Sequence, residues 1–390
     1  MPAIVSQASV ERSGEHLRQR WSLKDSGSSL RLDFEVSGKH EGLLRGGDSA
    51  DHALIALLPV CMSRGIDVHV EGSICDQLLS GLEEWQTIWA RWSPSRYRRV
   101  VITCSEVRHA VRTTADEPRR SLVAFSGGVD ATYTLFRHLL RSRGARTVPP
   151  ASALLVRGFD LPIDDDAAYR AAFERAESII AGQGVELVAV STNFRDLPLR
   201  WEDAFGAGLA SVMHLVSVGS SAGLIGSGEP YDTLTMPWGS SPVTDPLLSS
   251  REFEVRHDGA EANRTEKIAW LLENVGDEVL ARLRVCWEGD EPGRNCGRCE
   301  KCARTSLNFW AVGGEDRLPM GLTLSPRQVA GIRVRNLNQR KELLSVLLIA
   351  QQRRASSDPI LQALRFALIA AGPRRTVSRA RRRVRRLARR

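Results

Sequence analysis

Short apolar segments alternate with longer amphipathic ones over residues 121–226, and this alternation constrains the fold more than any other feature of the sequence. The apolar segments have the length of strands and are 121–125, 153–156, 185–190 and 224–226. The segments between them, which repeat apolar residues at helical spacing, are 131–140, 166–181 and 201–218. Strands that alternate with helices are joined by right-handed crossovers. The expected fold class is therefore α/β, a parallel sheet with helices on both faces.

A smaller α/β pattern precedes this one. Its strand-like segments are 30–36, 66–70 and 99–103, and its helical segments are 51–63 and 76–92. The second of these helices places Trp85, Trp89 and Trp92 on one face, because they fall four and three residues apart. We expect that face to pack the two patterns together, and a ligand-stacking surface is the alternative.

Composition divides the chain into five predicted segments. The polar stretch 113–120 separates the two α/β patterns, and clear helices are expected at 334–352 and 360–371. Residues 227–250 are rich in Gly, Pro and Ser, and loops this long are functional or disordered. The predicted segments are a flexible lead-in (1–28), an N-terminal α/β module (29–118), a second α/β domain with a cysteine cluster (119–310), C-terminal helices (311–372) and an Arg-rich tail (373–390).

A candidate phosphate-binding loop lies where the first strand of the larger pattern meets its helix, in Phe-Ser-Gly-Gly-Val-Asp-Ala-Thr over residues 125–132. Its glycines let backbone N–H groups converge on an anion, and the helix N-terminus adds partial positive charge. Asp130 is expected to cap the helix or to hold a Mg²⁺ that shields a polyphosphate. The residues predicted to bind phosphate are Ser126, Gly127, Gly128, Val129, Asp130 and Thr132.

The alternative interpretation of this loop is a Gly-Gly turn capped by Asp130. Its context favours phosphate, because parallel sheets bind ligands at the carboxyl ends of their strands.

Four of the seven cysteines fall within 17 residues of one another, namely Cys286, Cys296, Cys299 and Cys302. In a reducing compartment, clustered thiols favour a metal over disulfides. Zn²⁺ takes four thiolates in a closed tetrahedral site, so we expect structural zinc here. An iron–sulfur cluster or unmetallated thiols are the alternatives.

The loop over residues 126–130, Ser-Gly-Gly-Val-Asp, resembles the SGGxD motif of the PP-loop ATP pyrophosphatases, which have an adenine nucleotide alpha hydrolase-like fold. Most members carry Ser after the Asp; here Ala131 stands in its place, and Thr132 offers a compensating hydroxyl. Residues 296–302, Cys-Gly-Arg-Cys-Glu-Lys-Cys, are similar to the CGxCxxC of the 7-cyano-7-deazaguanine synthases of queuosine biosynthesis.

Residues 264–268 resemble a Lys/Glu-containing helix start of the same family, and the likeness extends over about 121–308. It does not cover the N-terminal module, the C-terminal helices or the tail. The chain is therefore expected to be a divergent relative, with 119–310 as its PP-loop domain.

The resemblance implies an ATP-dependent, C–N bond-forming ligase. A substrate carboxylate or carbonyl oxygen attacks the α-phosphate of ATP, pyrophosphate leaves, and a nitrogen nucleophile displaces AMP. The implied cofactors are ATP, Mg²⁺ and Zn²⁺, with a small carboxylate or deazapurine-like substrate and ammonia or an amine as donor. The implied catalytic residues are Ser126, Asp130 and Lys267. The acceptor is left open, inside queuosine synthesis or in a defence or secondary-metabolism pathway.

Further candidates to contact the nucleotide or the acceptor follow the predicted strands. Arg157 and Asp160 come after the strand 153–156, and Ser191 follows the strand 185–190. Loop capping is an equally good interpretation of all three.

In the long loop and beyond it, Glu229 is a candidate to orient an amine or the acceptor, and His257 to move a proton near neutral pH. Turn formation and a hydrogen-bonded loop histidine are the alternatives. Arg264 and Lys267 share a helical face and are candidates for phosphate contacts, with a solvated surface pair as the alternative.

Lys and Arg number 54 against 46 Asp and Glu, a formal charge of +8. Ten arginines and no acidic residue lie within 373–390, and without them the chain carries −2. We expect this tail to be a solvated, disordered end, and its candidate partners are nucleic acid or a partner protein.

The N-terminus lacks an apolar signal segment, and no apolar run reaches the length of a membrane span. We therefore expect an unexported, cytoplasmic protein without a membrane span, whose oligomeric state is open and compatible with a homodimer. The alternative functions are a tRNA-modifying PP-loop enzyme and a non-catalytic, zinc-stabilised scaffold that binds nucleic acid.

Overall fold

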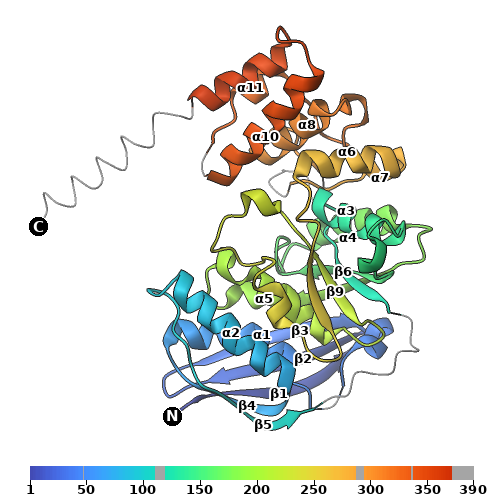
Figure 1. Ribbon diagram of the computed structural model, residues 1–390. Coiled ribbons are helices and arrows are strands. Elements are labelled where there is room, and N and C mark those ends of the chain that lie inside the picture. The colour runs from blue at the N-terminus through green and yellow to red at the C-terminus, as the bar shows by residue number, and fades with distance from the viewer. Residues whose placement is uncertain (47, 110–118, 287–293, 335–336, 371–390) are drawn as a thin grey trace, which may run out of the picture. The chain divides into compact units, whose positions relative to one another are not determined.

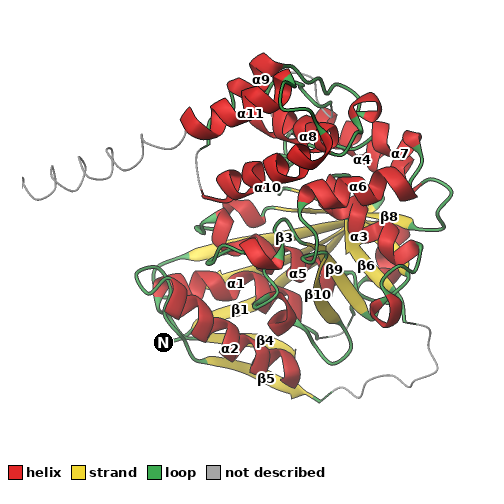
Figure 2. Ribbon diagram, turned by 45° about the horizontal axis from the view of Figure 1, so that its top comes forward, coloured by secondary structure: helices red, strands yellow, loops and turns green. Residues whose placement is uncertain are grey.

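The computed structural model describes residues 1–46, 48–109, 119–286, 294–334 and 337–370. They form two compact units (Figure 1, Figure 2). An α/β unit holds Met1–Gly228 and Leu234–Ala260, and a helical unit holds Glu229–Thr233 with the described residues from Glu261 on. The chain thus divides near residue 260, rather than at 118 and 310. The predicted boundary at 113–120 and the tail fall mostly or wholly outside the described residues.

One sheet crosses the whole α/β unit. Its strands are β1 (Ala3–Ser13), β2 (His16–Lys24), β3 (Ser29–Ser37), β4 (Val68–Cys75), β5 (Ile102–Arg108), β6 (Ser121–Ala124), β7 (Pro150–Arg157), β8 (Glu186–Thr192), β9 (Ala222–Gly226) and β10 (Glu254–Asp258). They stand in the order β10-β9-β6-β7-β8-β3-β2-β1-β4-β5. The α/β class with a mostly parallel sheet is confirmed.

Three antiparallel pairs, β8–β3, β3–β2 and β2–β1, interrupt the parallel sheet. Strands β6 to β10 run in one direction, whereas β1, β3, β4 and β5 run in the other. The carboxyl ends of these two sets therefore lie on opposite edges of the sheet.

Helices cover the two halves of the sheet differently. The helices of this unit are α1 (Asp51–Arg64), α2 (Asp76–Trp92), α3 (Val129–Leu139), α4 (Asp166–Ile180) and α5 (Trp201–Leu215). From β6 the chain moves through α3 and α4 to β8, and α5 then returns it past β6 to β9. Right-handed crossovers in opposite directions place their helices on opposite faces, so this half is covered on both.

The N-terminal strands depart from the expected two-sided cover. Leu32, Phe34 and Val36 of β3 are buried, and the alternate positions Arg31 and Asp33 are exposed or half-exposed. Helix α1 lies on the same face as α5, since Ser211 Oγ donates to the His52 carbonyl over 2.7 Å. A polar face therefore remains on these antiparallel strands.

The segment 1–28, expected to be flexible, contains the β1–β2 hairpin. Trp21 and Leu23 of β2 are buried in the core, and the intervening face carries charged side chains that pair across strands. Arg20 Nε lies 3.1 Å from Asp33 Oδ1, and Arg18 pairs with Glu35. These charges belong to ion pairs on a sheet face. The polar composition of residues 1–28 therefore led to the wrong prediction of a flexible segment.

The two predicted α/β patterns share one core. Strand β3 pairs with β8, with Phe34 opposite Thr192. The tryptophan face of α2 packs inside this core as predicted, and Trp89 is 1% exposed. A Cβ at Gly81 of α2 would lie 2.1 Å from the Leu247 carbonyl oxygen, so this helix touches the 245–248 segment directly.

The helical unit contains α6 (Arg264–Asn274), α7 (Asp277–Ala281), α8 (Glu300–Ala311), α9 (Pro326–Ala330), α10 (Leu337–Arg353) and α11 (Pro359–Ala370). The predicted helices at 334–352 and 360–371 correspond to α10 and α11. Leu307 and Trp310 of α8 share a core with Leu343 of α10 and Leu364 of α11, which explains why no boundary falls at residue 310. Among the described residues, no helix has the length and apolar character needed to cross a membrane.

Candidate functional site

The candidate phosphate loop lies where the crossovers diverge. Strand β6 stands between β9 and β7, and the chain leaves it towards β7 on one face and reaches β9 by the other. In open α/β sheets, ligands bind at this kind of switch point, outside the carboxyl ends of the strands. Residues 125–128 after β6 and 227–228 after β9 occupy that position.

The loop has the backbone that the sequence suggested. Gly127 adopts φ +72°, a conformation that side-chain-bearing residues rarely take. Gly128 is the N-cap of α3, and its carbonyl accepts from Thr132 N over 2.9 Å. Asp130 therefore stands inside the first turn, where the helix dipole favours a carboxylate, rather than at the cap. Ser126 is exposed, and Val129 begins the helix.

Two glycines outside the motif, Gly226 and Gly259, let neighbouring strand ends approach α3 closely. A Cβ at Gly226 would lie 2.9 Å from the Asp130 carbonyl oxygen and 3.2 Å from Thr134 Oγ1. Gly259, at φ +84°, would bring a Cβ to 3.4 Å from the Tyr133 ring. The ends of β9 and β10 thus lie against the first turns of α3. Strand β10 follows the predicted irregular stretch 227–250 and was itself not predicted, because five residues carry little periodicity.

Asp258 ties β10 to the far end of α3. Arg143 Nε donates to Asp258 Oδ1 over 3.1 Å, and His138 Nε2 lies 3.5 Å from the same oxygen. Burial opposes ionisation of this carboxyl, but the neighbouring His138 and Arg143 outweigh it and lower the pKa of Asp258 to about 2. This anchor could not be predicted from sequence, because the partners of Asp258 are over a hundred residues away.

Thr132 and Thr134 lie in the first turns of α3, next to the candidate phosphate loop, and their hydroxyls are fully buried. Neither Oγ1 has a hydrogen-bond partner within the part of the chain that the structure describes. A buried hydroxyl without a partner is unfavourable, so these atoms leave donor capacity beside the loop. This fits the predicted role of Thr132 towards a phosphate oxygen.

His257 belongs to a different network. Its Nδ1 lies 2.8 Å from Asp245 Oδ2, which also accepts from Ser240 Oγ over 2.6 Å. Asp245 Oδ1 accepts from Ser241 N over 3.0 Å. His257 is a buried residue of β10 and pins the 240–248 segment to the sheet, as the hydrogen-bonded alternative requires.

The candidate residues after β7 and β8 make local contacts or lie within a strand. The Arg157 guanidinium bonds to the Ile163 carbonyl and Asp166, and it lies 4.9 Å from the Tyr169 ring centre. Ser191 lies within β8, opposite Glu35 of β3, and Asp160 is exposed. For Arg157 this matches the loop-capping alternative.

Glu229 and Lys267 lie in the helical unit. Glu229 accepts from Asn338 of α10, and Lys341 Nζ donates to the Thr233 carbonyl over 2.9 Å. The short segment Glu229–Thr233 is thus tied to α10. Lys267 on α6 is 1% exposed, which contradicts its interpretation as a solvated surface residue.

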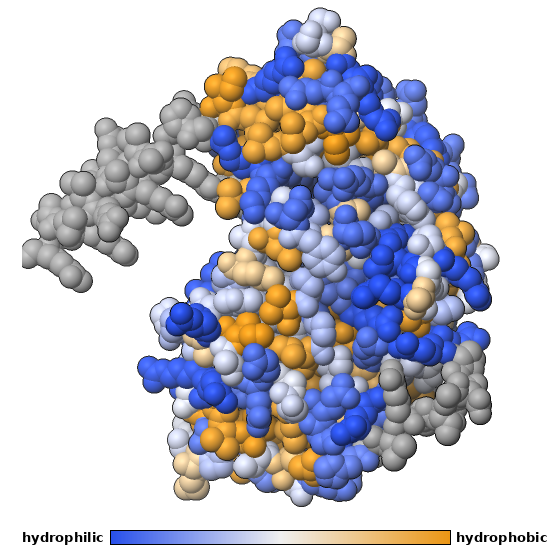
Figure 3. All heavy atoms as spheres, viewed as in Figure 1, coloured by the Kyte–Doolittle hydropathy of each residue, from blue (hydrophilic) through white to orange (hydrophobic). Residues whose placement is uncertain are grey.

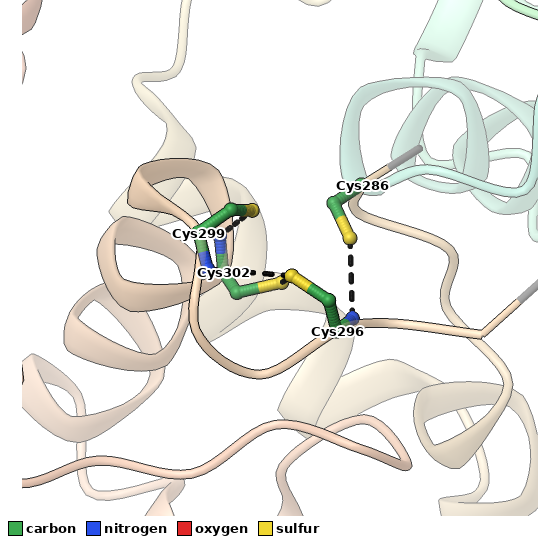
Figure 4. Close-up of side chains that lie close together, drawn as sticks. All are labelled: Cys286, Cys296, Cys299 and Cys302. Atoms are coloured by element: carbon green, nitrogen blue, oxygen red, sulfur yellow. Dashed lines mark hydrogen bonds between the residues drawn. The ribbon is translucent and has the colours of Figure 1, made fainter. Parts of the chain in front are cut away.

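The four clustered cysteines meet in the helical unit (Figure 4). Their sulfur atoms all lie within 4.8 Å of one another, and Cys296 Sγ is 3.8 Å from Cys302 Sγ. Sulfurs bound tetrahedrally to one ion at about 2.3 Å would stand about 3.8 Å apart. Cys296 comes from a loop in which Gly297 adopts φ +67°, and Cys299 is the N-cap of α8. The cluster can therefore hold a metal ion.

Backbone N–H groups favour the thiolate of Cys296 within this cluster. Cys296 N donates to Cys286 Sγ over 3.3 Å, and Cys299 N to Cys296 Sγ over 3.3 Å. Burial opposes ionisation of Cys296, but the N–H groups of Arg298 and Cys299 outweigh it and lower its pKa to about 7. Burial instead raises the pKa of Cys299 to about 11.

No family model, curated protein or solved structure matches the chain.

Proposed function

We propose that this chain is an ATP-dependent, AMP- and pyrophosphate-forming ligase of the 7-cyano-7-deazaguanine synthase type, built on a PP-loop fold. One observation carries most weight: the Ser-Gly-Gly-Val-Asp loop occupies the switch point between β6 and β9. Gly127 at φ +72° allows the tight turn of the loop, and Gly226 lets the end of β9 approach the first turn of α3 closely.

Different residues of the loop would bind different parts of ATP and its Mg²⁺. Backbone N–H groups of Gly127, Gly128 and Val129, with the α3 N-terminus, would bind the β- and γ-phosphates. Ser126 and Thr132 would donate hydroxyl hydrogen bonds, and Asp130 would hold Mg²⁺. Mg²⁺ held there would supply positive charge to the phosphates. Lys267 is buried on α6 of the helical unit, and its catalytic role stays a prediction from the resemblance alone.

Zn²⁺ is the ion we propose for the cysteine cluster. The donor set of four sulfurs and the 3.8 Å separation fit a closed structural site. Cys286, Cys296, Cys299 and Cys302 would hold the ion and join the loop before α8 to that helix. The ion has a structural role in this proposal. Reduced thiols also favour a cytoplasmic location.

Product analysis tests the activity. The full chain is incubated with ATP, Mg²⁺, ammonia and a panel of carboxylates that includes deazapurine carboxylates. We expect AMP and pyrophosphate in equal amounts. ADP and phosphate would contradict the proposal, as would the absence of ATP binding by calorimetry. ATP binding without turnover across the panel would favour the scaffold alternative, in line with Ala131.

Asp130→Ala and Asp164→Ala form a matched pair for the site assignment. Asp164 is exposed in the loop after β7, so its loss should leave pyrophosphate release unchanged. Asp130→Ala should reduce pyrophosphate release by about a hundredfold or more, because the Mg²⁺ proposed to neutralise the phosphates would lose a protein ligand. Equal activity of the two variants would overturn the role of Asp130.

A further inference from the structure

Arginines and aromatic rings lie together on the edge of the sheet that carries the candidate phosphate loop. Strands β4 and β5 run opposite to β6, β7 and β8, so the amino ends of the first two share an edge with the carboxyl ends of the others. The segment 93–101, which leads from α2 into β5, therefore stands on the same edge as the segment 193–200, which follows β8.

Direct contacts join the first of these segments to the start of α5. Arg96 Nε lies 3.0 Å from Asp203 Oδ2, and Tyr97 Oη donates to the same carboxylate oxygen over 3.3 Å. Asp203 is buried in the first turn of α5, which begins at Trp201. The segment 93–99 and the start of α5 are thus neighbours on this edge of the α/β unit.

A guanidinium group and aromatic rings pack together at the start of α5. The Arg195 guanidinium lies 4.6 Å from the Trp201 ring centre, and the ring centres of Trp201 and Phe205 are 5.9 Å apart. Trp238 packs against Phe205 at 5.5 Å and is 37% exposed. Arg195 is exposed and Trp201 is half-buried. Planar cationic and aromatic groups therefore remain accessible to solvent within one cluster.

The charge of this surface is positive, because the segments 93–99 and 195–202 contain five arginines and two acidic residues. One of these acids pairs with Arg200 over 3.1 Å. Arg98 and Arg99 are exposed, and neither forms an ion pair within the residues that the structure describes. Figure 3 shows hydrophilic residues at this end of α2, at the left of the view. We call Arg98, Arg99, Arg195, Trp201 and Trp238 the basic aromatic surface.

We propose that the basic aromatic surface binds single-stranded nucleic acid. Proteins hold such strands with basic groups along the backbone and with aromatic rings or arginine planes on which bases stack. Arg98 and Arg99 would contact phosphates, while Trp238 and the Arg195–Trp201 pair would accept bases. A duplex keeps its bases stacked inside the helix, so it could use the arginines alone. A bilayer takes up apolar side chains that project from the surface, whereas both tryptophan rings pack against Phe205.

Fluorescence anisotropy of the full chain tests this proposal with a labelled RNA single strand of about twelve nucleotides and with the same sequence as a duplex. We expect tighter binding of the single strand. Arg98→Ala with Arg99→Ala should reduce the slope of log K against log salt by about 1.4, which is about 0.7 for each lost phosphate contact. Arg119→Ala with Arg120→Ala is the matched control and should keep the parent's slope, because these exposed arginines precede β6 on the opposite edge.

The aromatic part of the surface is tested by a second pair of variants. Trp238→Ala should weaken binding of the single strand about tenfold or more at an unchanged salt slope, because a base loses its stacking partner. Trp238→Phe keeps a ring at this position and should retain most of the affinity. Circular dichroism melts check that every variant is folded.

Several results would overturn the proposal. They are failure to bind the single strand, equal affinity for the duplex or for anionic vesicles, equal effects of the two arginine pairs, and full affinity in Trp238→Ala. Loss of binding on truncation after Gly372 would also overturn it, since the ten arginines of 373–390 would then account for the affinity. The proposal does not depend on the ligase activity, which pyrophosphate release on the same samples reports separately.

Discussion

At the scale of single residues, Gly226 shows how little space remains beside the candidate phosphate loop. The Cβ of Gly226→Ala would meet the Asp130 carbonyl oxygen at 2.9 Å, so the first turn of α3 must shift. We expect a loss of about 1–3 kcal/mol in the free energy of unfolding and weaker ATP binding. Gly42→Ala, in the turn 38–43 far from this loop in sequence, meets nothing within 4 Å and should match the parent. Urea unfolding and ATP calorimetry compare the two, and equal behaviour would show that the contact is not needed.

His52 is the residue through which acid should act on stability. It is buried between Trp21 and Phe34, at ring-centre distances of 5.2 and 5.5 Å. Burial, assisted by the neighbouring His214, lowers its pKa to about 3. The unfolded chain therefore binds the proton first, at a pKa of about 6.5. His52 therefore does not lower the free energy of unfolding above about pH 6.5. Below that pH, the free energy of unfolding falls as pH drops towards 3.

We expect His52→Leu to flatten the fall of the unfolding free energy between pH 6.5 and 4, measured by urea denaturation at stepped pH. His16→Leu, at an exposed position, is the control and should keep the parent's slope. An unchanged slope in His52→Leu would mean that other groups, such as His214, dominate the acid response.

At the scale of elements, α6 depends on its first turn. Asn263 accepts from Glu266 N over 3.0 Å, and Glu266 Oε2 accepts from Asn263 N over 2.7 Å. Asn263→Ala should lower the free energy of unfolding by about 1 kcal/mol, whereas Asn263→Asp, which retains a capping oxygen, should change it little. Chemical denaturation of both variants measures the difference. Equal losses in the two variants would contradict a stabilising role for the capping oxygen of Asn263.

The cysteine cluster joins a loop to α8, and its proposed zinc ion can be tested apart from any activity. Cys302→Ser should reduce bound zinc from about one ion per chain and lower the melting temperature. Cys104→Ser, in β5 and away from the cluster, should leave the zinc content unchanged. Elemental analysis and thermal melts give both values. Iron in the purified chain, or full zinc in Cys302→Ser, would contradict a four-cysteine zinc site.

At the scale of the whole molecule, the shared sheet makes residue 118 a poor place to cut. A fragment of residues 119–390 loses the strand that pairs with β8 and the helix that covers α5. We expect it to aggregate, because buried residues such as Val212 and Met213 lose their cover. Residues 1–260 keep the entire sheet and should melt cooperatively. A soluble, folded 119–390 fragment would restore the two-module interpretation.

Local periodicity predicted most helices and most of the parallel strands, although it missed β1 and β10. Helices such as α2 and α3 carry their amphipathic pattern within a single segment. Non-local pairing was beyond its reach. The β1–β2 hairpin is stabilised by cross-strand ion pairs such as Arg20–Asp33, which look like loop charges in sequence. The same limit applies to the candidate site: its glycine motif is local, while Gly226, Gly259 and Asp258 reach α3 only through the sheet.

The reversal of strand direction between β8 and β1 gives the molecule two independent rims. Loops after β6 and β9 open on the rim of the candidate phosphate site, and those after β4 and β5 open on the other. Cys75 and Arg108 end those last two strands. Sequence changes there do not touch the candidate phosphate loop, so the two rims are free to diversify at different rates.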